Sequence, residues 1–80
     1  MVDLTERQRA LLKAIIEQYI ESAEPIGSEV IERRFDLGVS PATIRNEMVK
    51  LTEVGFLKQP HTSAGRVPTS LGFRTYIQEL

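Results

Sequence analysis

The stretch "SEVIERRFDLGVSPATIRNEM", residues 28–48, decides the fold of this chain. It contains two short helical patterns separated by a turn at Gly38, which can take the left-handed backbone conformation that closes a helix. Ser28 is a good N-cap for the first pattern. Ser40 and Pro41 start the second, because proline at the first helical position loses no hydrogen bond. Two helices joined by a short glycine-containing turn are typical of a helix-turn-helix unit, although any small helical bundle contains such a pair.

Toward the N-terminus, Thr5 and Gln8 form a T-x-x-Q capping box that starts a longer helix, expected to run to about Glu21. Its apolar residues recur at helical spacing and are Leu12, Ile15, Ile16, Tyr19 and Ile20. The segment Pro25–Gly27 breaks this helix and has room for one or two sheet-like hydrogen bonds. The helix after it is expected to cover residues 29–35.

Toward the C-terminus, the third helix is expected to end at Gly55. "FLKQ" (56–59) and "RVPT" (66–69) then predict two short antiparallel strands connected by "PHTSAG" (60–65). Proline within these segments cannot donate a ladder hydrogen bond, so the hairpin should be short. A final helix, capped by Thr69 or Ser70, follows.

These patterns predict one domain over residues 1–80, mainly α with a small β-hairpin. A three-helix core, a two-stranded wing and a C-terminal helix make a winged helix-turn-helix fold. Besides the first helix, the expected core residues are Val30, Ile31, Phe35, Ile44, Met48, Leu51, Phe56, Leu57 and Phe73. Phe73, Tyr76, Ile77 and Leu80 are expected on one face of the last helix, buried against the first.

Composition excludes several classes of protein. The chain has 80 residues, 41% of them hydrophobic and 26% charged, which is typical of a globular domain. It has no cysteine and a single histidine, His61, so neither a disulfide nor a metal site is expected. His61 has no acidic neighbour in sequence that could orient it as a general base, so we expect no enzyme and no cofactor. The lack of a membrane-spanning apolar run suggests a cytoplasmic protein, associated with the nucleoid when bound to DNA.

Charge is distributed unevenly along the chain, although the net charge is only −1. Residues 1–38 hold eight acidic and five basic side chains, whereas residues 39–80 hold three acidic and five basic ones. No acidic residue occurs from Val54 to Gln78. The second half of the chain therefore has the sign of charge that a polyanion requires.

The third helix carries the first candidate binding surface. With Ile44 facing inward, the side chains of Ala42, Thr43, Asn46 and Lys50 point away from the core, and Arg45 lies at the flank. Arginine can read guanine, asparagine can read adenine, and threonine or alanine can contact a thymine methyl group. Ser40 and the first free N–H groups behind Pro41 could hold a phosphate. A merely solvated face would usually carry more glutamate and lysine.

The predicted hairpin supplies the second surface. Lys58, His61 and Arg66 are expected to flank its tip, where Thr62 and Ser63 offer donors to phosphate. Gly65 would allow the backbone to approach a ligand closely. An arginine at such a tip could enter the minor groove. An ordinary polar loop remains the alternative.

The segments "LTERQRALLKAIIEQYIESAEPIGS", "GVSPATIRNEM" and "GFLKQPHTSAGRVPT" resemble the N-terminal winged-helix domain of the HrcA heat-inducible transcription repressors. This resemblance implies a bacterial repressor of chaperone operons that binds an inverted-repeat operator called CIRCE. It also implies a homodimer in a longer protein, and the chaperonin GroEL as a partner. Carried over to this chain, the recognition segment is Ser40 to Asn46 with Lys50, and the wing is His61 to Arg66.

A protein-interaction or dimerisation module is the competing class, because winged helices also dock proteins through the same surfaces. Such a module would show no affinity for duplex DNA and no salt dependence of binding.

Overall fold

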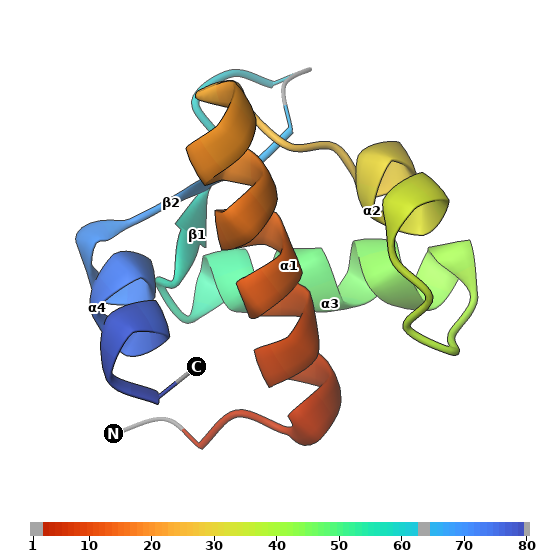
Figure 1. Cartoon of the computed structure of the whole chain (residues 1–80), viewed down its shortest axis with the longest axis horizontal. Coiled ribbons are helices and arrows are strands. Elements are labelled where there is room, and N and C mark those ends of the chain that lie inside the picture. Colours follow the sequence, from red (N-terminus) through yellow and green to blue (C-terminus); the bar gives the residue numbers. More distant parts are fainter. Residues whose placement is uncertain (1–2, 63–64, 80) are drawn as a thin grey trace.

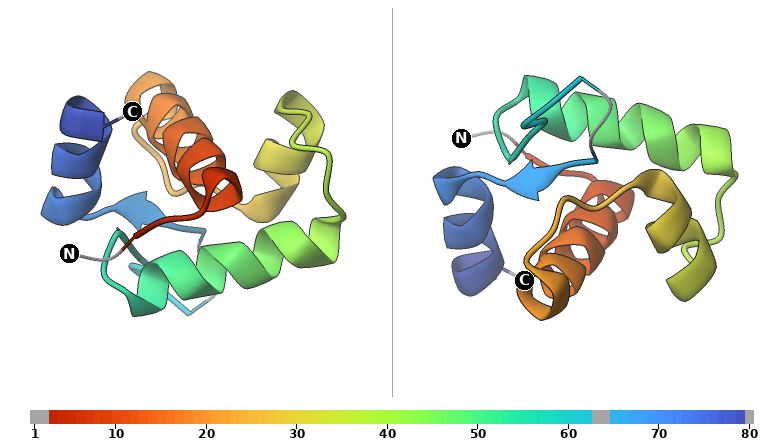
Figure 2. Two further views of the ribbon diagram at one scale, coloured as in Figure 1. Left: turned by 90° about the horizontal axis from the view of Figure 1, so that it is seen from below. Right: turned by 90° about the horizontal axis from the view of Figure 1, so that it is seen from above.

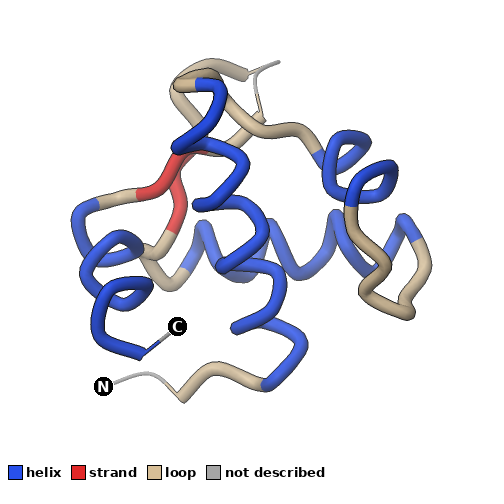
Figure 3. The backbone as a smooth tube through the Cα atoms, viewed as in Figure 1, coloured by secondary structure: helices blue, strands red, loops and turns tan. Residues whose placement is uncertain are grey.

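The computed structural model describes residues 3–62 and 65–79. The described residues form four helices and one two-stranded antiparallel sheet (Figures 1 and 3). In chain order the elements are α1 (Glu6–Ser22), α2 (Ser28–Arg34), α3 (Pro41–Glu53), β1 (Leu57–Lys58), β2 (Val67–Pro68) and α4 (Ser70–Glu79). The predicted winged-helix arrangement is confirmed, with α1 between α4 on one side and α2 on the other, and α3 crossing it (Figure 1).

Helix α1 is the centre of the core. Its capping box forms as predicted: the Gln8 N–H donates to Thr5 Oγ1 and the Thr5 N–H donates to Gln8 Oε1, each at 3.0 Å. Its C-cap is Ala23, a non-glycine residue with φ of 57°, whose N–H reaches the Tyr19 carbonyl at 2.7 Å. The side chains of α1 that are almost fully buried are Leu11, Leu12, Ile15 and Ile16. Each such side chain contributes roughly 1.5–3 kcal/mol by leaving water.

The turn between α2 and α3 is built by local hydrogen bonds. The Asp36 carboxylate accepts the Gly38 N–H at 3.2 Å, and Gly38 has a positive φ of 71°. Ser40 then caps α3 by accepting the Thr43 N–H at 3.2 Å, and Pro41 occupies the first helical turn as expected. The predicted cap of α2 is wrong by one residue. Ser28 is already helical, and the N-cap is Gly27, which offers no side-chain hydrogen bond.

The sheet is short, as its prolines predicted, and pairs Leu57 with Pro68 and Lys58 with Val67. The extended segment before α2 adds one further bridge. The N–H of Ile26 donates to the Arg66 carbonyl, and the N–H of Arg66 donates to the Ile26 carbonyl, both at 2.8 Å. This pair of bonds ties the start of the helix-turn-helix unit to the wing strand.

Helix α4 begins at a threonine cap and packs on α1. Thr69 Oγ1 accepts the Gly72 N–H at 3.1 Å, so Thr69 is the N-cap of the two predicted alternatives. The Phe73 ring lies 6.1 Å from the Tyr19 ring between centroids. The Tyr76 hydroxyl donates to Glu17 Oε2 at 3.3 Å. Partial burial of the ring, and then the charge and hydrogen bond of Glu17, raise the pKa of Tyr76 above its ordinary value.

Two apolar residues expected in the core are exposed. Ile77 is 80% exposed and Ile20 is 59% exposed, so neither is buried at the contact between α4 and α1. Ile77 is one residue, or about 100°, around the helix from Tyr76, which makes the contact with α1. Leu80, predicted on the same face, lies outside the described residues.

This exposure gives a first test. Replacing Ile77 by lysine should change the free energy of unfolding by less than about 0.5 kcal/mol, because the side chain already lies mostly in water. Urea denaturation followed by circular dichroism measures the change. A decrease of about 2 kcal/mol or more in the free energy of unfolding would show instead that Ile77 is packed in the core.

Candidate nucleic-acid interface

Helix α3 forms one outer face of the molecule, and the segment that follows β1 projects on the same side (Figure 2). Within α3, the residues predicted to face outward are arranged much as expected: Ala42, Arg45, Asn46 and Lys50 are exposed, whereas Thr43 is half-buried. Ile44, Met48 and Leu51 fill the opposite, buried face. The structure therefore brings the recognition segment and part of the wing to one side of the domain.

At the N-terminal end of α3, polar side chains form hydrogen bonds within the protein that the sequence did not indicate. Ser40 Oγ accepts the Thr43 N–H and lies 3.0 Å from Thr43 Oγ1, so both hydroxyl groups already have a partner. Pro41 is exposed and has no N–H to donate. The Ser40 hydroxyl can still contact a phosphate, but the hydroxyl groups at this helix end already have hydrogen-bond partners within the protein.

The basic residues of α3 each have an acidic neighbour. Arg45 Nη1 lies 3.8 Å from Glu32 Oε2 on α2, and Lys50 Nζ lies 4.0 Å from Glu47 Oε1. Both basic side chains stay mostly in water, Arg45 at 59% and Lys50 at 64% exposure, and the two contacts are long, so either cation can turn to a phosphate or a base. Asn46 is exposed, and within the described part of the chain its side chain makes no hydrogen bond.

Glu47 is a further residue of the site, and its role cannot be seen in the sequence pattern. It is only 7% exposed and is held by the Arg7 guanidinium at 3.7 Å and by the Gln8 amide at 3.3 Å. These contacts fix α3 against the start of α1. Its acidic charge is thereby directed toward partners within the protein, and the exposed residues of α3 from Pro41 to Asn46 include no acidic side chain.

In the wing, Lys58, His61 and Thr62 are exposed, as predicted. The Gln59 amide donates to the Thr62 carbonyl at 3.0 Å, which shapes the connection after β1. Ser63 lies outside the described residues. Among the described residues, no group of three or more histidine, cysteine, aspartate or glutamate side chains could hold a metal ion.

Two wing residues lie differently from the prediction. Arg66 is half-buried at the base of the wing, paired with Ile26 through its backbone, and its Nε donates to Thr52 Oγ1 on α3 at 2.9 Å. A Cβ at Gly65 would collide with the Ile26 carbonyl and the Gly27 nitrogen. Gly65 is therefore required for the close approach of two protein segments, where the sequence analysis had assigned it to the approach of a ligand.

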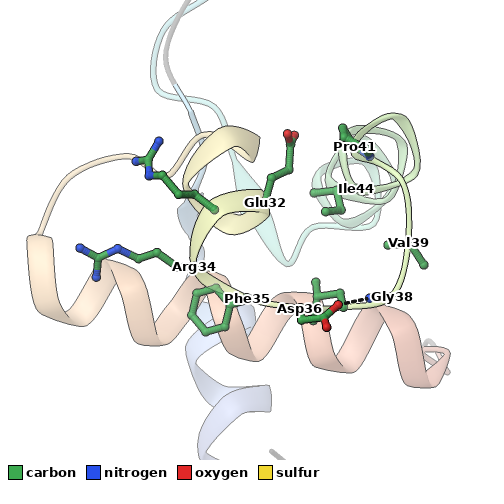
Figure 4. Close-up of a pocket in the computed structure, with 10 residues that line it drawn as sticks. Glu32, Arg34, Phe35, Asp36, Gly38, Val39, Pro41 and Ile44 are labelled. Carbon is green, nitrogen blue, oxygen red and sulfur yellow. Dashed lines mark hydrogen bonds between the residues drawn. The ribbon is translucent and has the colours of Figure 1, made fainter.

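Two hollows flank α3. One, of about 300 Å³, is lined by Gly27, by the first turn of α2 with Glu29, by α3 with Arg45 and Val49, and by the wing with Arg66. The other, of about 430 Å³, lies at the turn, where Glu32 extends beside Pro41 and Ile44 and Arg34 points away from them (Figure 4). Charges of both signs line the second hollow, so it has no clear preference for an anion.

Comparison with known proteins decides the family. The family model described as "Winged helix-turn-helix transcription repressor, HrcA DNA-binding" matches residues 3–79. The chain belongs to this family. The HrcA resemblance of its motifs and its winged-helix fold are thus confirmed.

Curated HrcA relatives match the chain along its whole length. The heat-inducible transcription repressor HrcA of Carboxydothermus hydrogenoformans is 58% identical over 80 residues, which are 100% of this chain and 23% of that protein. The repressor of the same name from Clostridioides difficile is 58% identical over 79 residues, 99% of this chain and 23% of that protein. The chain thus spans about a quarter of the length of the curated relatives that it matches.

A solved crystal structure has the same fold. It is described as that of a hypothetical protein, and it superposes with a TM-score of 0.90 at 46% sequence identity, covering 95% of this chain and 24% of that chain. No helix in the described residues is long and apolar enough to cross a membrane.

Proposed function

We propose that the chain binds duplex DNA sequence-specifically, as the DNA-binding domain of a heat-inducible transcription repressor. The observation that carries this proposal is that α3 and the segment after β1 lie on one side of the molecule (Figure 2). Arg45, Asn46 and Lys50 of α3 and Lys58 of β1 are all exposed. Membership of the HrcA family supports it. A helix of 13 residues with small and hydrogen-bonding side chains at its N-terminal half suits the major groove.

In this proposal the side chains divide into two groups. Ala42, Thr43, Arg45 and Asn46 read base edges. The others lie along the phosphate backbone or the minor-groove edge. The polar contacts there come from Ser40, Lys50, Lys58, His61, Thr62, Ser63 and Arg66, whereas Pro41 and Gly65 have no side-chain donor and shape the two segments. For Thr43, base contact requires that its hydroxyl exchange Ser40 for a base, since the two oxygen atoms lie 3.0 Å apart.

The wider role extends beyond this chain. We propose that it forms the N-terminal part of a longer homodimeric repressor of chaperone operons, acting at the nucleoid in the cytoplasm. The operator is an inverted repeat of the CIRCE type, and the chaperonin GroEL is the regulatory partner. A two-fold dimer would place its two α3 helices about 34–36 Å apart, one helical turn of DNA, or a multiple of that distance.

Salt titration tests the proposal. Binding of labelled duplex, measured by fluorescence anisotropy at several salt concentrations, should weaken with a log–log slope of about −0.9 for each neutralised phosphate. Lys58→Ala should reduce the magnitude of that slope by about 0.9, because it removes one phosphate contact. Lys13→Ala on the exposed side of α1 is the matched control for charge and should leave the slope unchanged. Absence of duplex binding, or binding that ignores salt, would favour a protein-interaction module instead.

A further inference from the structure

Hydrogen bonds hold both the backbone and the side chain of Arg66. Its backbone N–H and carbonyl are both bonded to Ile26, and its Nε donates to Thr52 Oγ1 at 2.9 Å. The Thr52 hydroxyl in turn donates its single proton to the Met48 carbonyl at 2.7 Å, so that its lone pairs face the guanidinium. The side chain of a wing residue is therefore attached to the C-terminal half of the recognition helix.

The rest of the guanidinium stays available. Within residues 3–62 and 65–79, the terminal nitrogen atoms Nη1 and Nη2 of Arg66 make no hydrogen bond or ion pair. Arg66 and Arg45 line the same 300 Å³ hollow beside α3, together with Glu29. Because the Glu29 carboxylate opposes an incoming phosphate, charge alone does not make this place favourable. Binding of a phosphate here therefore depends on the direction in which the terminal N–H groups of Arg66 point.

We propose that Thr52 is a positioning residue for DNA binding. By accepting the Arg66 Nε–H it orders the guanidinium before DNA arrives, and it directs the terminal N–H groups toward the strand that Arg45 approaches. The inference rests on the proposed function and deepens it, since it adds a residue that contacts no DNA. A free arginine would lose its rotamer freedom on binding, and a pre-ordered one has already lost it. Because the free energy of ordering this side chain no longer opposes binding, Kd should be about 2- to 12-fold lower.

Five proteins test the proposal: the unaltered chain, Thr52→Val, Thr52→Ser, Arg66→Ala and the double variant that combines Thr52→Val with Arg66→Ala. Valine keeps the shape of threonine but removes the hydroxyl, and serine keeps the hydroxyl. The duplex Kd is measured for each at several salt concentrations, and Thr52→Val is also measured in the Arg66→Ala background. The thermal midpoint of each variant is recorded beside the Kd.

Thr52→Val should raise Kd about 2- to 12-fold with an unchanged salt slope, because the Arg66 charge remains. Thr52→Ser should bind like the unaltered chain. Arg66→Ala should reduce the magnitude of the salt slope by about 0.9. Adding Thr52→Val to Arg66→Ala should not raise Kd any further. An equal loss from Thr52→Val with and without Arg66 would overturn the positioning role, and so would an unchanged Kd. Both outcomes leave DNA binding itself intact, whereas failure of the unaltered chain to bind any duplex would end both proposals.

If Thr52→Val does not fold, nuclear magnetic resonance of the unaltered chain decides. The Arg66 Nε–H should exchange with water more slowly than that of Arg33, which is exposed and, among the described residues, has no side-chain partner. Equal exchange rates for the two arginines would refute a pre-ordered Arg66.

Discussion

Ile31→Ala is expected to lower the free energy of unfolding by about 2–5 kcal/mol, the range for deleting a large aliphatic side chain from a packed core. Ile31 has no exposed surface, and it is the one residue of α2 that is fully buried. A domain of 80 residues has a total stability of roughly 4–12 kcal/mol, so this single change removes a large part of it.

The effect should extend to the interface, because α2 has only seven residues and a helix of that length is not stable alone. Its place depends on Ile31, with Val30 and Phe35 half-buried beside it. Loss of this anchor frees Glu32 and the turn, and with them the N-terminal end of α3. Guanidinium denaturation and duplex affinity, measured on the same samples below the unfolding transition, report both consequences.

Val30→Ala is the control for this prediction, since it shortens the neighbouring side chain at a half-buried position. Val30→Ala should lower the free energy of unfolding clearly less than Ile31→Ala does. Equal losses for the two variants would mean that α2 is held by its general apolar character and not by one buried contact.

The features that sequence reasoning found are local ones. The Thr5–Gln8 box, the Ser40 cap and the turn at Gly38 depend on residues within three positions of one another, and such chemistry is visible in the printed sequence. The bridge formed by the segment Pro25–Gly27 was also anticipated, because an extended stretch between helices leaves its backbone groups in need of partners.

The features that it missed join distant parts of the chain. Arg66 reaches Thr52 across 14 residues, and Gln8 reaches Glu47 across 39. Periodicity gives the face on which a side chain lies but not the element that it meets. For this reason the sequence alone predicts Arg66 beside the tip of the wing and Gly65 close to a ligand, whereas in the structure tertiary packing uses both residues. Ile77 was expected in the core because hydrophobicity alone does not show which residues of α4 reach α1.

Asn46→Ala is expected to weaken binding to the preferred duplex by about 1–3 kcal/mol, or roughly 5- to 150-fold in Kd, while barely changing the affinity for random duplex. Asparagine can form two hydrogen bonds to adenine in the major groove, through its carbonyl oxygen and its amide nitrogen. Asn46 is exposed on the outer face of α3, six residues after the cap at Ser40, and its side chain makes no hydrogen bond among the described contacts.

The preferred duplex for this measurement is first selected from a random pool by the unaltered chain. Kd is then measured on the selected and on a shuffled sequence for Asn46→Ala and for Lys58→Ala. The lysine variant is the control, because loss of a phosphate contact should weaken both duplexes equally and reduce the salt slope. Asn46→Ala should instead lower the ratio of the two affinities and leave the slope unchanged. An equal loss on both duplexes would assign Asn46 to the DNA backbone and leave base reading to Arg45 and its smaller neighbours on α3.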